Sequence, residues 1–159
     1  MADIVKRSGK LPYYEVGEAF CKMTGFTELS TSKKPIEYSR RYIDENFERN
    51  DVVGYSTQIS YSFDMFTGNS VHEDMASIAD GELIGTDAVR NIVLVDFTKK
   101  NTSGAYSAVK RSFSIIPDTE GDSTDAYTYS GTMKAAGDII KGTVTSSDDF
   151  ATVTFTAEN

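Results

Sequence analysis

The clearest pattern in the chain is a strict alternation of apolar and polar residues between Val53 and Met65. Side chains of a β-strand point alternately to its two faces, so this period of two predicts one long, half-buried strand. At about 3.3 Å per residue it would span roughly 45 Å, which is longer than most strands of globular proteins. One face would carry Val53, Tyr55, Thr57, Ile59, Tyr61, Phe63 and Met65, and the other Gly54, Ser56, Gln58, Ser60, Ser62 and Asp64.

A short amphipathic helix is predicted directly after this strand. Thr67–Asn69 interrupts the alternation, and Ser70 followed by Glu73 matches a capping box with Ser70 as the N-cap. Asp80-Gly81 is expected to end the helix. The helix has apolar residues at helical spacing, so one of its faces can pack on a sheet. These residues are Val71, Met75 and Ile78.

Other alternating or apolar segments predict further strands. Pro12–Leu29 is expected to form one or two of them, and the later strands are expected at Asn91–Thr98, Ala105–Ile116 (ended by Pro117), Ala126–Ala136, Ile139–Thr145 and Phe150–Thr156. About seven or eight strands with one short flanking helix predict a mainly-β domain, a β-sandwich or barrel spanning residues 1–159.

The segment Ser30–Asn50 differs from the rest because it is densely charged and rich in aromatic residues, with little periodicity. Tyr, Phe and Arg are enriched in protein–protein interfaces, so we predict an interaction surface here. The alternative is an irregular helix packed on its own domain. The residues expected to make contact are Lys33, Lys34, Ile36, Tyr38, Arg40, Arg41, Tyr42, Phe47 and Arg49.

Composition limits the classes of partner. Of 159 residues, 39% are apolar and 25% charged, which favours a folded chain over a disordered one. Residues 1–50 hold 9 Lys/Arg and 8 Asp/Glu and residues 51–159 hold 7 and 16, so the net charge of −8 comes from the latter part. Such acidity argues against tight binding to nucleic-acid phosphates.

The sequence also predicts neither a membrane partner nor a disulfide. A membrane-spanning helix needs about 20 consecutive apolar residues, and no apolar stretch of the sequence approaches that length. The N-terminus also lacks a signal-peptide core, so synthesis in the cytoplasm is expected. Cys21 is the sole cysteine and is expected to be a buried free thiol.

No catalytic or metal-binding pattern is found. The one histidine, His72, is expected to face solvent, and its helical neighbours Glu73 and Asp74 point in other directions. Asp118–Asp125 has its glycine at the fourth place of a calcium loop, not the sixth, and no glutamate at the twelfth. Gly81–Gly85 lacks the Lys-Ser/Thr of a phosphate loop. We therefore expect a protein without enzymatic activity or cofactor.

The order of these segments carries a family resemblance. The most specific stretches are SKKPIEYSRRYIDE at Ser32–Glu45, VVGYSTQISYSFD at Val52–Asp64 and VHEDMASIADGELIGTDAVR at Val71–Arg90. In order and spacing the chain resembles, over nearly its whole length, the tail tube proteins (major tail proteins) of tailed bacteriophages that infect Gram-positive hosts. Tube proteins of phage-like bacteriocins and secretion systems have a related fold and stay an alternative, as does a non-catalytic carbohydrate-binding β-sandwich.

The resemblance implies a structural protein of the virion tail, assembled in the host cytoplasm. Its sandwich would form sixfold rings whose sheets join around a channel, with Ser30–Asn50 as the loop that stacks the rings and residues 1–10 and the C-terminal end as arms. The implied partners are copies of itself, the tape measure protein, and tail terminator and baseplate proteins, and viral DNA would pass through without specific binding.

The polar face of the central strand is the candidate channel lining. It carries small hydroxyl and amide groups, one carboxylate and no basic residue, which would keep a passing polyanion solvated and centred by repulsion. The alternative is that this face is the solvated outside or is covered by a neighbouring ring. The residues concerned are Ser56, Gln58, Ser60, Ser62 and Asp64.

Overall fold

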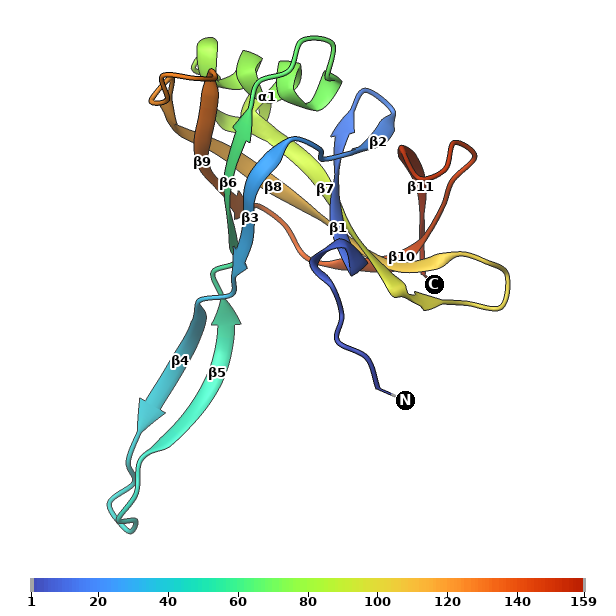
Figure 1. Ribbon diagram of the computed structural model, residues 1–159. Coiled ribbons are helices and arrows are strands. Elements are labelled where there is room, and N and C mark those ends of the chain that lie inside the picture. The colour runs from blue at the N-terminus through green and yellow to red at the C-terminus, as the bar shows by residue number, and fades with distance from the viewer. Residues whose placement is uncertain (1, 159) are drawn as a thin grey trace.

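The computed structural model describes residues 2–158 and consists mainly of β-strands with one α-helix (Figure 1). The strands are β1 (Lys10–Val16), β2 (Ala19–Lys22), β3 (Phe26–Ser32), β4 (Pro35–Arg40), β5 (Arg49–Tyr55), β6 (Gln58–Asp64), β7 (Val89–Lys100), β8 (Tyr106–Glu120), β9 (Thr128–Ala135), β10 (Ile140–Thr145) and β11 (Thr152–Ala157). The helices are α1 (Ser70–Asp80) and the single 3-10 turns η1 (Arg7–Gly9) and η2 (Gly85–Ala88).

Nine strands form one sheet that closes partly on itself. Their order is β10-β11-β2-β1-β7-β8-β9-β6-β3, and β10 also pairs with β8. The extra pairing closes β1, β2, β7, β8, β10 and β11 into a barrel, while β9, β6 and β3 extend from the second half of β8. The predicted sandwich or barrel with one flanking helix is confirmed. It has more strands than expected because the N-terminal segment supplies three, β4 was not predicted, and the predicted central strand is divided into β5 and β6.

Two hydrophobic cores lie on opposite faces of the shared strands. The barrel interior holds Tyr13, Phe20, Val93, Val95, Ala108, Val144 and Val153. The second core lies between the extended sheet and α1 and includes Tyr14, Ile59, Tyr61, Phe63, Met75, Ile78, Ile92, Phe113 and Met133. Because β7 contributes Ile92 to one core and Val93 to the other, both of its faces are apolar, as the sequence of an inner strand predicts.

Helix α1 covers the end of the extended sheet that lies away from the β4–β5 hairpin (Figure 1). Val71, Met75 and Ile78 are fully buried, as their helical spacing predicts. Within residues 2–158, no helix combines the length and the apolar character that crossing a bilayer demands.

The long strand predicted from Val53 to Met65 is interrupted. β5 ends at Tyr55 and β6 begins at Gln58, and the two belong to different sheets. In β6 the predicted apolar residues are buried, but Val53 and Tyr55 in β5 are exposed. The alternation of apolar and polar residues continues through both strands. Only the apolar face of β6 is covered, because β6 lies in the body of the domain and β5 does not.

Pro117 does not end β8, contrary to expectation. The strand continues to Glu120, and its pairing with β7 has already stopped at Ser114. The register with β9 shifts between Pro117 and Thr119. With one side of β8 unpaired at this point and a bulge on the other, the missing N–H of proline is tolerated.

Candidate assembly surface

Most of the segment predicted to be an interaction surface lies in a β-hairpin, formed by β4 and β5, that projects from the body (Figure 1). The start of the predicted segment, Ser30–Ser32, instead belongs to β3 of the main sheet. β4 and β5 pair only with each other, from Pro35–Tyr55 at the base to Arg40–Arg49 near the tip. Lys34 lies at the junction with the main sheet, where its φ of 42° turns the chain and its carbonyl accepts the N–H of Ser56 at 3.0 Å. The alternative of an irregular helix packed on the domain is therefore wrong.

Large apolar side chains of the hairpin are exposed. Tyr38 and Phe47 keep 56% and 59% of their surface accessible, and Ile43 at the tip is fully accessible. Within residues 2–158 the hairpin is a separate two-stranded sheet, and its own two strands cannot bury these groups. An apolar surface of this kind, flanked by charged residues, is typical of a protein–protein contact.

Two arginines order the aromatic side chains of the hairpin. The Arg40 guanidinium lies 4.8 Å from the ring centre of Tyr38, and the Arg49 guanidinium lies 5.5 Å from that of Phe47. Arg40 pairs with Asp51, and hydrogen bonds to Tyr42 and Asp51 raise its pKa. Arg49 binds Glu45 at 2.8 Å. The arginines thus preorganise the surface from within, which the sequence alone did not indicate.

The expected contact residues separate into two groups. Ile36, Tyr38, Arg40, Arg41, Tyr42, Phe47 and Arg49 lie on the hairpin or its tip. Lys33 and Lys34 lie at its base, where Lys34 Nζ donates to Gln58 Oε1 at 3.1 Å.

The polar face of β6 is part of a wider face rich in hydroxyl groups. Ser60 lies opposite Ser30 of β3 and Thr132 of β9, and Ser62 lies opposite Ser130. Gln58, Ser60, Ser62 and Asp64 are all partly exposed, whereas Ser56 lies outside the strand, in the junction below the hairpin. The face is less free of positive charge than β6 itself, because Lys34 and Lys134 both lie next to Gln58.

The N-cap of α1 is Asn69, so the predicted capping box is wrong by one residue. The Asn69 side chain accepts hydrogen bonds from the N–H groups of Val71 and His72. Ser70 is the first helical residue, and its hydroxyl instead contacts Cys21, a partly buried free thiol. Glu73 still reaches back, accepting the N–H of Gly68 at 3.1 Å. Asparagine caps helices as well as serine does, so the residue type alone does not choose between Asn69 and Ser70.

His72 is fully buried, so its predicted exposure is also wrong. Its Nδ1 accepts the N–H of Phe66 at 3.1 Å, its Nε2 lies 2.6 Å from the carbonyl oxygen of Thr24, and its ring stacks on Phe63. Burial lowers the pKa of His72. The histidine joins the turn before α1 to the loop before β3 and is a structural group.

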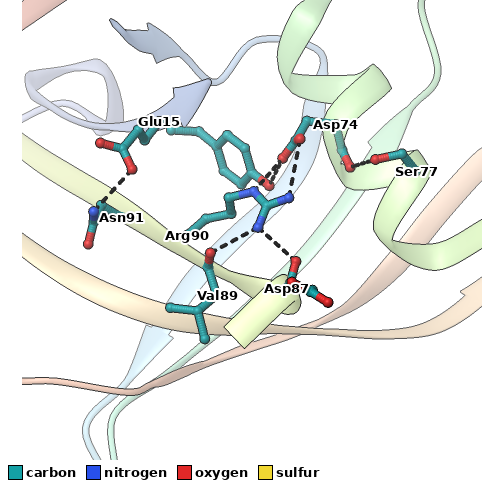
Figure 2. A network of polar contacts seen from close by, with 8 residues as sticks. Glu15, Asp74, Ser77, Asp87, Val89, Arg90 and Asn91 are labelled. Atoms are coloured by element: carbon teal, nitrogen blue, oxygen red, sulfur yellow. Dashed lines mark hydrogen bonds and ion pairs between the residues drawn. The ribbon is translucent and has the colours of Figure 1, made fainter. Parts of the chain in front are cut away.

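A network of polar side chains holds α1 to the sheet (Figure 2). Arg90 Nε donates to Asp74 Oδ2 at 2.9 Å, and Tyr14 donates to the same oxygen. Arg90 also donates to the backbone carbonyls of Asp87 and Val89, so it fixes η2 beside the helix. Burial and the bond to Asp74 raise the pKa of Tyr14. Tyr14, Asp74 and Arg90 are hydrogen-bonded to one another and to backbone carbonyls. This arrangement is typical of groups that fix a helix in place rather than of a proton-transfer site.

No protein-family model matches the sequence, and no curated protein matches it. Among solved structures, a chain of the cryo-EM structure of the anti-feeding prophage baseplate, 6-fold symmetrised, superposes with a TM-score of 0.54 at 10% identity, covering 89% of this chain and 97% of that chain. The two proteins share a fold. A chain of the sheath–tube complex of an extracellular contractile injection system (PVC, extended state) gives a TM-score of 0.46 at 18% identity, covering 89% and 93%.

Proposed function

We propose that this protein is a structural subunit of a phage-tail-like particle, in which copies form rings that stack into a tube. The observation that carries the proposal is the hairpin of residues 35–55, whose exposed aromatic side chains have no partner layer within the described part of the chain. A fold shared with a baseplate chain of a sixfold-symmetrised particle supports it. In this role the protein has no catalytic activity of its own and belongs to the tail of the particle.

The open edge of the main sheet supports ring formation. β3 pairs with β6 on one side only, and it is the one end of the strand order that the barrel does not close. An unpaired edge strand is a template for another chain, and pairing in a closed ring removes it. A ring of subunits would therefore satisfy the backbone groups of β3.

The hydroxyl-rich face of β3, β6 and β9 is our candidate for the channel wall. Gln58, Ser60, Ser62 and Asp64 on β6 would face the channel, with Ser56 at its rim. Hydroxyl and amide groups bind water readily, and this face has few lysine or arginine side chains to bind phosphates. Viral DNA would therefore pass without specific binding. The tape measure, terminator and baseplate proteins would be the other partners of such a tube.

A second candidate is a ring protein of a baseplate, which the shared fold with the anti-feeding prophage baseplate chain favours. Negative-stain electron microscopy of the concentrated protein tests both. Tubes support the tail tube, single rings that do not stack support the baseplate ring, and a protein that stays monomeric at every concentration contradicts both.

A further inference from the structure

An apolar cleft opens at the base of the hairpin, between the β3–β6 pair and strands β1, β7 and β8. Lys33 and Thr57 line it, so it lies at the end of the second core that α1 does not cover. Leu29, Leu94 and Val109 form part of its walls, and Ile139, with 48% of its surface accessible, stands at its mouth. The cleft extends the hydrophobic core to the surface.

Three cations surround this cleft: Arg7, Lys33 and Arg111. Arg7 donates to the carbonyls of Lys10 and Leu29, and Arg111 donates to the carbonyl of Gly137 at 2.7 Å. None of the three forms an ion pair with a carboxylate among residues 2–158. An occupant of the cleft would thus need apolar side chains and accompanying negative charge.

A loop with those properties follows directly after α1, at the end of the body that lies away from the hairpin (Figure 1). Gly81–Gly85 exposes Ile84, which keeps 81% of its surface accessible, and part of Leu83. Asp80 and Glu82 supply two carboxylates, and neither is in an ion pair within residues 2–158.

The backbone of this loop is held in shape. The N–H of Glu82 donates to the carbonyl of Ala79 at 3.2 Å, and that of Leu83 donates to the carbonyl of Ile78 at 3.1 Å. Glu82 has a φ of 49° and Gly85 a φ of 62°, so the turn is tight at both ends. A preorganised loop loses little conformational freedom when it binds.

We propose that the Gly81–Gly85 loop of one copy docks into the cleft of the next copy, with Ile84 against the apolar walls and Asp80 and Glu82 against the three cations. The inference rests on the proposed ring stacking. It adds a second contact between stacked copies to the one made by the hairpin. Loop and cleft are different surfaces at opposite ends of the body of the domain, so the contact is head to tail and repeats along a stack wherever its rotation does not close into a ring. The hairpin would run alongside the same neighbour, because Lys33 belongs to both its base and the cleft.

Charge reversal tests the pairing. Glu82→Lys and Lys33→Glu should each raise the critical concentration for assembly. In the double variant the critical concentration should be lower, by about threefold or more, than the product of the two single effects predicts, because residues in contact are coupled in double-mutant cycles. Glu18, exposed in the turn between β1 and β2, provides the matched control, because Glu18→Lys should not rescue Lys33→Glu. Rescue by the control, or no coupling in the double variant, overturns the pairing.

Cross-linking separates this inference from the proposed function. A variant with Ile84→Cys and Ile139→Cys should give a ladder of covalent oligomers on mild oxidation, and one with Glu18→Cys and Ile139→Cys should not. Wild-type tubes without a specific ladder overturn the docking and leave the tube standing. A specific ladder without tubes keeps the docking and overturns the tube, and the absence of both overturns both. Circular dichroism establishes that each variant is folded.

Discussion

Tyr13 and Tyr14 are adjacent in β1, yet their side chains enter two different hydrophobic cores, and neither has any exposed surface. The Tyr13 hydroxyl donates to the carbonyl of Phe150 in the barrel at 2.6 Å, and the Tyr14 hydroxyl donates to Asp74 of α1. β1 therefore connects the barrel to the helix-covered sheet, and a change at either tyrosine tests one core at a time.

Tyr14→Phe should lower the free energy of unfolding by about 1–3 kcal/mol, because the packing is kept while Asp74 loses one hydrogen bond. Tyr14→Ala should cost about 3–5 kcal/mol, since a large cavity is added. Urea denaturation measures both. A Tyr14→Phe variant as stable as the wild type would show that Arg90 alone satisfies Asp74.

The position of the helix cap can be tested by two alanine substitutions. Asn69→Ala should cost about 0.5–2 kcal/mol, because two backbone N–H groups lose their acceptor. Ser70→Ala is the matched control and should change the free energy of unfolding by no more than about 0.5 kcal/mol. The reverse ranking in urea denaturation would restore Ser70 as the cap.

Removal of the hairpin should abolish stacking without unfolding the body. The Lys34 carbonyl and the Ser56 N–H are already hydrogen-bonded at 3.0 Å, so a short glycine-containing turn can replace residues 35–55. We expect an unchanged denaturation midpoint and no tubes by electron microscopy. Tubes of normal length would exclude the hairpin as a stacking element, and an unfolded product would place it in the folding core.

Acid should destabilise the protein through His72. Its pKa is lowered in the folded state from an ordinary value near 6.5, so the unfolded chain binds a proton more readily. The stability due to neutral His72 is complete above about pH 6.5 and decreases as the pH falls below that value. Protonation at Nδ1 would also remove the hydrogen bond from the Phe66 N–H.

Urea midpoints at pH 7.5 and 5.5 measure this dependence. His72→Gln is the control, because it lacks the titrating ring and should lose the difference between the two pH values. The lowered pKa values of Asp96 and Asp148, the latter about 2, place their own contributions at more acidic pH. An equal loss in the His72→Gln variant would assign the effect to other groups.

Lysines on the face of β6 that we propose as the channel wall should make the tubes bind DNA. Tubes of the Gln58→Lys, Ser60→Lys, Ser62→Lys variant should retain duplex DNA at low salt and release it steeply as salt rises, because each fixed cation displaces counterions from the phosphates. Fluorescence anisotropy measures this, with wild-type tubes as the control. Equal DNA binding by both would exclude this face from the channel.

Local patterns in the sequence determined much of the fold. The period of two at Ile59, Tyr61 and Phe63 and the helical spacing of Met75 and Ile78 identified side chains that are all buried. These predictions hold because a strand or a helix with one apolar face has to cover that face with another element. The density of aromatic and charged residues likewise distinguished Ser30–Asn50 from the rest of the chain. Most of this segment lies in the projecting hairpin, where its aromatic side chains are exposed.

Only the tertiary structure decided which apolar faces are covered. Tyr55 continues the same alternation as Ile59 yet is exposed. Residues of β1, β7, β8 and α1 share a core with the apolar face of β6, whereas no other sheet within residues 2–158 includes or pairs with β5. His72 is buried because Phe66 and Thr24, six and 48 residues away, supply both of its hydrogen bonds. The cleft at Lys33 also arises from strands far apart in the chain, whereas the loop at Ile84 is held by local hydrogen bonds to α1. Periodicity is a local property, whereas burial depends on contacts between distant segments, and the sequence alone states the first but not the second.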